Sequence, residues 1–312
     1  MTSRPIVIAH RGASGYLPEH TLPAKALAYG LGADFLEQDV VATRDHRLVV
    51  LHDIYLDDVT DVARRFTGRH RDDGRHYVVD FDLAEIETLS VVERRAPGSD
   101  APRFPARFPA ATAIAGVTTL ATELKLLQGL NKSMGRRVGI YPEIKAPEWH
   151  RRHGIDLAAL LLAELAAYGY ETAEAPAFVQ CFDARELVRV RDELGCALRL
   201  IQLVEPTPEY ADLLTADGLR QVARYAHGLG PSHMQVAHGE SGRPRLTPLA
   251  GLAHDCGLEI HPYTFRRDEL PAHGRTLEDL LAFFFVEARV DGVFCDHPDV
   301  AVRVRDRVLE VQ

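Results

Sequence analysis

Short apolar runs rich in β-branched residues alternate with longer amphipathic segments along most of the chain. Runs of the first kind predict buried strands, whereas apolar residues that recur every three or four positions predict helices. The predicted strands are residues 5–10, 35–41, 138–144, 176–181, 197–203, 226–230, 258–263 and 291–296. The predicted helices are residues 21–31, 119–133, 155–168, 183–194, 217–226, 246–256, 276–288 and 298–309.

Eight strand and helix units in succession favour an α/β fold in which helices surround a parallel sheet. Eight units over about 250 residues are typical of a TIM (β/α)8 barrel. A doubly wound open sheet is the alternative. The chain has 312 residues, and we predict one TIM-barrel domain over residues 1–312 with an inserted segment after the second strand.

The inserted segment is predicted at residues 53–116, where the periodicity weakens and Asp, Arg, Gly and Pro accumulate. We expect it to lack a core of its own. A segment of this length usually either covers an active site or varies freely. Its acidic residues Asp57, Asp58 and Asp61 are candidates for a lid over a ligand, and a solvated surface is the alternative.

The charge balance narrows the choice of ligands. The chain carries 36 Lys and Arg against 45 Asp and Glu, a net charge of -9. Nucleic-acid binders usually have a basic face that neutralises phosphates, so we expect no nucleic-acid partner. Any phosphate ligand must be held by local charges. The sequence leaves the oligomeric state open.

The cysteines and the ends of the chain bear on its compartment. Cys181, Cys196, Cys256 and Cys295 are widely spaced, which favours buried thiols over a zinc site or a disulfide framework. No stretch approaches the roughly 18 apolar residues that span a bilayer, so stable membrane insertion is not expected. As written, the chain is expected to be cytoplasmic; a periplasmic or secreted protein whose signal peptide has been removed is the alternative.

Candidate chemistry lies at the ends of the predicted strands. Glu37 and Asp39 are two residues apart on the second strand, so both carboxylates point to one face. Glu143 and Lys145 repeat this spacing on the third barrel strand. Buried carboxylates repel unless a cation neutralises them. Three hard oxygen ligands suit Mg²⁺ or Ca²⁺. The alternatives are an exposed edge strand whose acids face water, for the first pair, and an ordinary Glu–Lys pair, for the second.

Two histidines end strands in the same region. His10 follows the first strand directly and precedes Arg11, and His52 closes the apolar run at 48–51. A lone histidine at a strand end is usually structural. Two of them near three carboxylates and an arginine favour acid and base chemistry, because imidazoles titrate near neutral pH.

The strand ends that carry these candidate residues, and the sequence around them, resemble the glycerophosphodiester phosphodiesterases, in particular the bacterial periplasmic type. The resemblance is carried by "AHRGASGYLPEHTLPAKALAYGLGADFLEQDVVATRDHRLVVLHD" at 9–53, "GIYPEIKAP" at 139–147, and residues 179–194, 261–271 and 291–299. It covers nearly the whole chain and implies a TIM barrel with an insertion after the second strand. One departure is His20, which stands where many relatives have asparagine.

The resemblance implies roles for individual residues. His10 and His52 match the catalytic histidines, and Arg11 and Lys145 match the residues that hold the phosphate. The matching metal ligands are Glu37, Asp39 and Glu143. The implied cofactor is one divalent cation, with Ca²⁺ favoured and Mg²⁺ as the alternative.

The implied reaction is hydrolysis of glycerophosphocholine, glycerophosphoethanolamine, glycerophosphoglycerol and similar diesters to glycerol 3-phosphate and an alcohol. The two histidines would move protons, and either water or the neighbouring glycerol hydroxyl would attack phosphorus. The alternatives are phospholipase D-like or phosphoinositide phospholipase C-like cleavage of intact lipids, and a noncatalytic phosphate-binding relative.

Residues near later strand ends form a second group of candidates. Gln180, Phe182, Tyr263 and Asp296 are candidates for contact with the glycerol or the leaving alcohol. His233 and His261 are further pocket candidates. Packing or support of neighbouring residues is the alternative for each of them.

Overall fold

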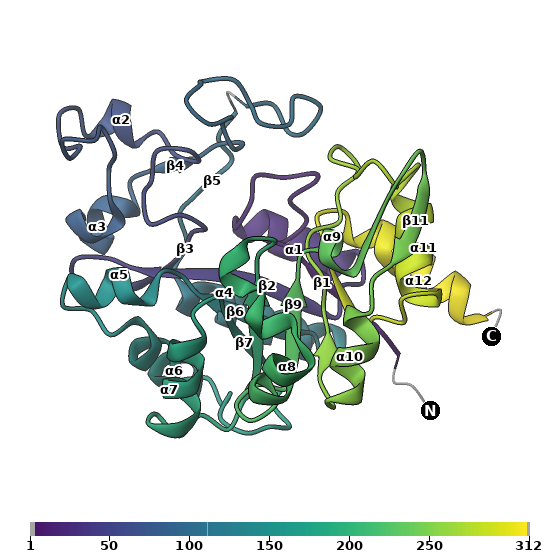
Figure 1. Ribbon diagram of the computed structural model, residues 1–312. Coiled ribbons are helices and arrows are strands. Elements are labelled where there is room, and N and C mark those ends of the chain that lie inside the picture. Colours follow the sequence, from purple (N-terminus) through teal and green to yellow (C-terminus); the bar gives the residue numbers. More distant parts are fainter. Residues whose placement is uncertain (1–3, 111, 311–312) are drawn as a thin grey trace.

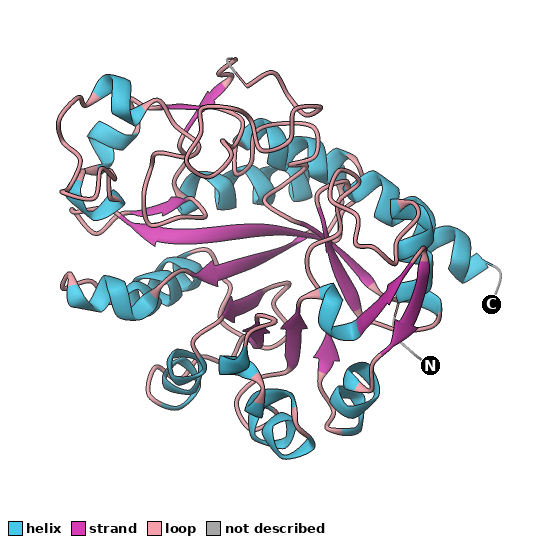
Figure 2. Ribbon diagram, turned by 45° about the horizontal axis from the view of Figure 1, so that its top comes forward, coloured by secondary structure: helices cyan, strands magenta, loops and turns pink. Residues whose placement is uncertain are grey.

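The computed structural model describes residues 4–110 and 112–310, in which eight parallel strands form a ring surrounded by helices (Figures 1 and 2). The strands of the ring are β1 (Ile6–Ala9), β2 (Phe35–Ala42), β6 (Gly139–Ile144), β7 (Phe178–Cys181), β8 (Arg199–Val204), β9 (Gly228–Pro231), β12 (Glu259–Ile260) and β13 (Gly292–Cys295). They correspond to the eight predicted strands. Ladder pairing runs from β12 through β9, β8, β7, β6, β2 and β1 to β13.

Backbone hydrogen bonds between the segments that contain β12 and β13 close the ring. The amide of Asp291 donates to the carbonyl of Ile260 at 3.0 Å, and the amide of Phe294 donates to the carbonyl of Pro262 at 3.0 Å. An open sheet has no such bonds between its two edge strands. The TIM-barrel prediction is therefore confirmed, and the doubly wound alternative is wrong.

The outer helices correspond to the eight predicted ones. They are α1 (Leu22–Gly30), α4 (Leu120–Met134), α6 (Leu157–Ala167), α7 (Ala184–Asp192), α8 (Ala216–Val222), α10 (Leu249–Asp255), α11 (Leu277–Val286) and α12 (Pro298–Glu310). Side-chain oxygens cap the first turn of six of them, from Thr21, Thr119, Asp156, Asp183, Thr215 and Thr276. Helix α10 starts three residues later than predicted, because residue 246 belongs to a β-hairpin.

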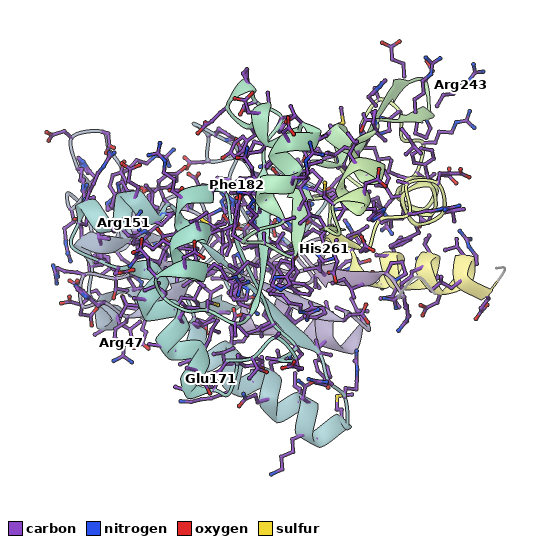
Figure 3. All side chains as sticks on the ribbon, turned by 60° about the horizontal axis from the view of Figure 1, so that its bottom comes forward. Arg47, Arg151, Glu171, Phe182, Arg243 and His261 are labelled. Atoms are coloured by element: carbon purple, nitrogen blue, oxygen red, sulfur yellow. The ribbon has the colours of Figure 1, made fainter. Side chains whose placement is uncertain are left out.

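That hairpin consists of β10 (Ala237–Glu240) and β11 (Arg243–Leu246). Arg243 lies at its outer end, far from Phe182 near the middle of the molecule (Figure 3). The other loops outside the insertion contain α5 (Pro147–Arg152), α9 (His233–Val236) and the 3-10 helices η2 (Pro208–Tyr210) and η3 (Asp212–Leu214). Within the described residues, no helix has the length and apolar character required to cross a membrane.

A layer of large apolar side chains fills the inside of the barrel. Its members come from six different strands and are Ile8, Phe35, Tyr141, Phe178, Ile201 and Phe294. Successive inward-facing side chains of a strand are two residues apart. The next inward positions toward the carboxyl ends are therefore mostly polar: His10, Glu37, Glu143, Gln180, Leu203 and Asp296. The strand period thus places the chemistry directly above an apolar floor.

The insertion forms one side of the molecule (upper left in Figure 1). Strand β3 (Leu48–Val50) leads into it and pairs antiparallel with β2. The insertion then contains α2 (Val62–Arg65), η1 (Val78–Asp80), α3 (Leu83–Ile86), β4 (Ser90–Val91) and β5 (Ala115–Gly116).

The apolar residues of the insertion extend the main hydrophobic core of the protein and, among the described residues, do not form a separate one. Leu56, Val62, Val78, Phe81 and Ile86 are each fully buried and join the main hydrophobic core of the protein. The sequence pattern hid them because they stand singly among polar residues. Short turns, not regular helices or strands, bring them together.

The three aspartates proposed as a lid hold the loops of the insertion together. Asp57 lies 2.8 Å from Nδ1 of His76, and Asp58 accepts from Arg75 at 2.7 Å. Asp61 accepts from the backbone amide of residue 90 at 2.8 Å. None of the three is among the residues that line the pocket described below, so the lid interpretation is not supported for them.

A buried ion pair joins α1 to α4 behind β2. Nζ of Lys25 lies 2.9 Å from Oε2 of Glu123, and both side chains are at most 2% exposed. Lys25 also donates to the backbone carbonyl of Glu37. The pair therefore supports the strand that carries two of the three acidic residues.

We predict that Lys25→Met lowers the free energy of unfolding by about 3–5 kcal/mol, because it leaves a buried carboxylate without its cation. Urea unfolding at pH 7 measures the change. The control is Arg152→Ala, which removes an exposed pair with Glu148 and should cost less than about 1 kcal/mol. Equal effects of the two substitutions would contradict the prediction.

Candidate active site

A pocket of about 510 Å³ opens at the carboxyl ends of the strands. Its lining includes ten of the residues proposed from the sequence: His10, Arg11, Glu37, Asp39, His52, Glu143, Lys145, Gln180, Phe182 and Tyr263. They come from β2, β6 and β7 and from the segments that follow β1, β3, β6, β7 and β12. In TIM-barrel enzymes this end of the barrel carries the active site.

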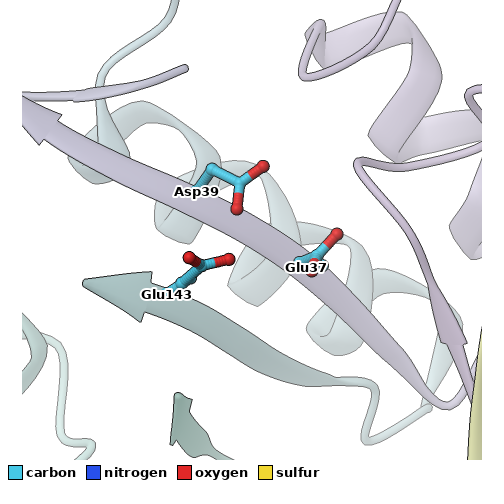
Figure 4. A group of neighbouring side chains, drawn as sticks. All are labelled: Glu37, Asp39 and Glu143. Atoms are coloured by element: carbon cyan, nitrogen blue, oxygen red, sulfur yellow. The ribbon is translucent and has the colours of Figure 1, made fainter. Parts of the chain in front are cut away.

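Three carboxylates converge at one wall of the pocket (Figure 4). Glu37 and Asp39 share β2, and Asp39 is paired in register with Glu143 of the neighbouring strand β6. One oxygen from each carboxylate lies within 4.8 Å of the others. All three side chains are buried, so their charges are poorly screened.

The three carboxylates repel one another when they are ionised, and this repulsion affects their pKa values. Burial, together with the charge of Asp39, raises the pKa of Glu37 well above its usual value. Burial also raises the pKa of Glu143 to about 8, against the opposing effect of Lys145. Burial would raise the pKa of Asp39 too, but Lys145 and His20 outweigh it and hold that pKa well below its usual value. Only one of the three groups is thus well stabilised as an anion by the protein alone.

The residues present fit a divalent cation. Oδ1 of Asp39 is buried and has no hydrogen-bond partner. Glu37 is held from both sides, because its two oxygens accept from the backbone amide of Arg11 at 2.8 Å and from Gln180 at 3.0 Å. Carboxylate oxygens are hard ligands of the kind that Ca²⁺ and Mg²⁺ prefer. The acidic triad can therefore hold such an ion.

The turn after β1 aims the amide of Arg11 at Glu37. Arg11 has a φ of 58°, in the left-handed region that costs energy for a residue with a Cβ. Gly12 follows with a φ of 88°, and a Cβ there would lie 2.9 Å from the backbone carbon of Ala24. Glycine is therefore required at this position.

Two cationic side chains flank the triad. The guanidinium of Arg11 lies 3.0 Å from Glu19 and 3.5 Å from Asp39. The ammonium of Lys145 lies 2.8 Å from Glu143 and 4.0 Å from Asp39. An anion that entered the pocket would find positive charge on both sides of the carboxylates.

Each candidate catalytic histidine is paired with an aspartate. Nδ1 of His10 lies 2.6 Å from Asp296, and Nδ1 of His52 lies 2.8 Å from Asp53. Burial lowers the pKa of His10 to about 4 and that of His52 to about 3. Both imidazoles are thus neutral at pH 7. We assign the proton to Nδ1 because a carboxylate only accepts, which leaves Nε2 free as a base.

Aromatic side chains form another wall of the pocket. The Phe182 ring lies 6.0 Å from the Tyr263 ring and 5.9 Å from Nζ of Lys145. The hydroxyl of Tyr263 donates to the carbonyl of Val204 at 2.9 Å. These rings offer an apolar surface beside the charged groups.

Some neighbours of the site were not identified from the sequence. Nε2 of His20 lies 2.7 Å from Asp39, so this departure from many relatives holds an acidic residue of the triad. Glu19 and Asp53 orient Arg11 and His52, and their only signal was their place inside the stretch at 9–53. Arg94 binds both carboxylates from within the insertion, where no periodicity marked it.

Two secondary candidates lie in different places. His233 lines the pocket, as expected. His261 does not, because it points inside the barrel, where its Nδ1 lies 2.8 Å from the hydroxyl of Tyr141 and the side chain is fully buried. It belongs to the layer beneath the pocket.

The fold and the pocket together define a class: a TIM-barrel protein with the groups required to hydrolyse a phosphate ester. A model of the Glycerophosphoryl diester phosphodiesterase family matches residues 10–300. The chain therefore belongs to that family.

Individual relatives agree with this assignment. The chain is 41% identical to the Glycerophosphodiester phosphodiesterase of Haemophilus influenzae, over 97% of this chain and 90% of that protein. It is 35% identical to the Glycerophosphodiester phosphodiesterase of Treponema pallidum, over 96% of this chain and 92% of that protein.

The solved structures include an Oleispira antarctica phosphodiesterase in complex with its product sn-glycerol-3-phosphate. It has a TM-score of 0.65 and 19% identity to this chain, with 97% of each chain covered. At this identity the likeness supports the fold.

We predict that Ca²⁺ or Mg²⁺ raises the melting temperature, because an ion that binds only the folded state and relieves the repulsion adds about 2.7 kcal/mol at 100 times its Kd. Scanning calorimetry with increasing metal concentration measures the shift. Glu143→Gln should remove most of the shift. A shift of equal size in this variant would place metal binding elsewhere.

Proposed function

We propose that this protein hydrolyses glycerophosphodiesters such as glycerophosphocholine, glycerophosphoethanolamine and glycerophosphoglycerol. The products are glycerol 3-phosphate and the released alcohol. One observation carries the proposal: an acidic triad, two histidines that are each paired with an aspartate, and two cationic side chains line one pocket in a chain of this family. Each group has a task in phosphodiester cleavage.

Glu37, Asp39 and Glu143 would hold one divalent cation, and we favour Ca²⁺ over Mg²⁺. Ca²⁺ takes six to eight oxygen ligands in flexible geometry, whereas Mg²⁺ demands a near-ideal octahedron. When bound, the cation polarises a nonbridging phosphoryl oxygen and stabilises charge that develops in the transition state. It also resolves the repulsion that raises the pKa of both glutamates.

Arg11 and Lys145 would bind the phosphodiester anion. Their charges partly neutralise the acidic triad and remain close enough to the pocket to attract a phosphate oxygen. Because β6 and the turn after β1 hold them, little conformational entropy is lost when the ligand binds.

His10 and His52 would move the protons. One imidazole would accept the proton of the attacking hydroxyl at Nε2 and become an imidazolium. In the substrate complex the other would carry a proton on both nitrogens, stabilised by its aspartate and by the phosphate anion. It would pass its Nε2 proton to the leaving alkoxide oxygen and return to the neutral form. Asp296 and Asp53 keep each ring in the tautomer that presents Nε2. Such proton transfer typically contributes about 10²- to 10⁴-fold in rate.

Gln180, Phe182 and Tyr263 would contact the remainder of the substrate. Gln180 also fixes Glu37 by a hydrogen bond of 3.0 Å. The rings of Phe182 and Tyr263 provide an apolar wall for the glycerol or the alcohol group. Among the described residues, Met234 alone of the exposed large apolar side chains lines the pocket, which favours deacylated substrates over intact lipids.

We predict that the purified protein releases glycerol 3-phosphate from glycerophosphocholine and that a chelator stops the reaction. Intact phosphatidylcholine should not be cleaved at a comparable rate. A coupled assay for glycerol 3-phosphate, with and without chelator, measures both. Turnover confined to the intact lipid would reject the proposed substrate class, and turnover that resists the chelator would reject the metal requirement.

We further predict that His10→Ala and His52→Ala each lower kcat by at least about 100-fold, because each removes a proton-transfer group. The matched control is His254→Ala. His254 also pairs with an aspartate, Asp291 at 2.9 Å, but it lies on the outer helix α10. Its loss should leave kcat unchanged. Comparable losses in all three variants would contradict the assignment.

A further inference from the structure

In each histidine–aspartate pair, the aspartate is contacted by an arginine of the insertion. Arg94 contacts Asp53, and Arg107 contacts Asp296. Asp53 begins the insertion and Asp296 follows the last strand of the barrel, and both arginines come from the insertion, residues 53–116. The insertion thus reaches behind both histidines.

Arg107 is locked in place behind His10. Its Nη2 donates to Oδ2 of Asp296 at 2.7 Å, while Oδ1 of the same carboxylate lies 2.6 Å from His10. The other edge of the guanidinium donates to both oxygens of Asp268 at 2.7 and 2.8 Å. The group also stacks on the Phe104 ring at 3.9 Å, and the side chain is only 6% exposed.

Arg94 has the corresponding position behind His52. Its Nη1 donates to Oδ2 of Asp53 at 2.8 Å, and Oδ1 of Asp53 lies 2.8 Å from His52. Nε and Nη2 form a fork to Glu19 at 2.9 and 2.6 Å. Glu19 in turn accepts from Arg11 at 3.0 Å. One arginine therefore links a histidine pair to the proposed phosphate-binding arginine.

Other arginines of the insertion behave differently. Arg71 forms a fork to Asp80 and also lies 3.2 Å from Nε2 of His153, and Arg103 reaches Glu269 at 3.1 Å. Among the described arginines of the insertion, Arg94 and Arg107 alone bind a carboxylate that is itself paired with His52 or His10. A contact such as that of Arg103 joins the insertion to the barrel without touching a histidine–aspartate pair.

The arginine contact determines where each aspartate points. A carboxylate that is held through one oxygen can rotate and release its histidine, whereas a planar guanidinium that holds the second oxygen fixes its plane. Asp296 also accepts from Nε of Arg266 at 3.0 Å, so His10 has two such supports and His52 has one. Precise orientation of an imidazole is what proton transfer requires.

We propose that Arg94 and Arg107 are positioning residues, by which the insertion orients the two histidine–aspartate pairs for proton transfer. The inference rests on the proposed function, because it assigns the histidines to that reaction. It gives the insertion a task in turnover that a cover or a freely varying loop would not have.

Kinetics of single variants give the first test. We expect Arg107→Ala to lower kcat for glycerophosphocholine by about 10- to 100-fold with little change in KM. Arg94→Ala should lower kcat similarly and also raise KM, because Glu19 then holds Arg11 less firmly. The matched control is Arg71→Ala. It removes a two-pronged contact with Asp80 and a cation–π contact with the Tyr77 ring at 4.5 Å, and it should leave kcat and KM unchanged.

A double-mutant cycle tests whether Arg107 acts through Asp296. Asp296→Asn alone should lower kcat. If the arginine acts through this aspartate, Arg107→Ala should lower kcat by less than about threefold further in that background. A full additional loss would show a separate effect and would overturn the proposed route. Arg107→Lys keeps the charge but not the fork, so it should melt close to the wild-type temperature and still lose kcat.

Nitrogen-15 NMR of the imidazoles supplies a readout that does not depend on turnover. The wild-type protein should show His10 and His52 protonated at Nδ1, with assignments from His10→Ala and His52→Ala. Arg107→Ala should add the other tautomer at His10, and Arg94→Ala should add it at His52. Unchanged tautomers together with kcat values equal to those of Arg71→Ala would overturn the proposal. Wild-type protein without diesterase activity but with these tautomer changes would reject the function and retain the positioning role.

Discussion

Repulsion among three buried carboxylates is the constraint on which the rest of this structure depends. Glu37, Asp39 and Glu143 stand on two adjacent strands, where water cannot screen them. The neighbouring groups compensate only in part: Lys145 and His20 stabilise the charge of Asp39, whereas both glutamates keep raised pKa values. A site with this residual negative charge favours binding of a cation. A cation held there can bind a phosphate anion that the carboxylates alone would repel.

The barrel carries the reactive groups around this acidic triad, and the insertion supports them. The strand period places the reactive groups one layer above Phe35, Tyr141 and their neighbours, so the walls of the site share the rigidity of the sheet. The histidines sit at the ends of strands, and each is paired with an aspartate, His10 with Asp296 and His52 with Asp53. The second oxygens of these aspartates are held by arginines of the insertion.

The sequence predicted the barrel well because strand burial and helix amphipathicity are local patterns. It also indicated the triad, since spacing of two on a buried strand leaves carboxylates such as Glu37 and Asp39 on one face. The contribution of the insertion to the main core was missed, because residues such as Phe81 are brought together by turns that have no period. The arginines that hold the histidine–aspartate pairs were hardest to predict. Arg94 and Arg107 come from a segment whose path the sequence does not reveal, and their role depends on contacts with residues up to 189 positions away.

The apolar layer inside the barrel determines how substrate and product reach and leave the site. The side chains of six strands fill the interior below the reactive groups, so that end of the barrel offers no passage to a polar molecule. Substrate therefore enters and product leaves through the same opening of the pocket. Glycerol 3-phosphate occupies the position that the phosphate of the next diester needs, so product that has not yet left competes with substrate for binding.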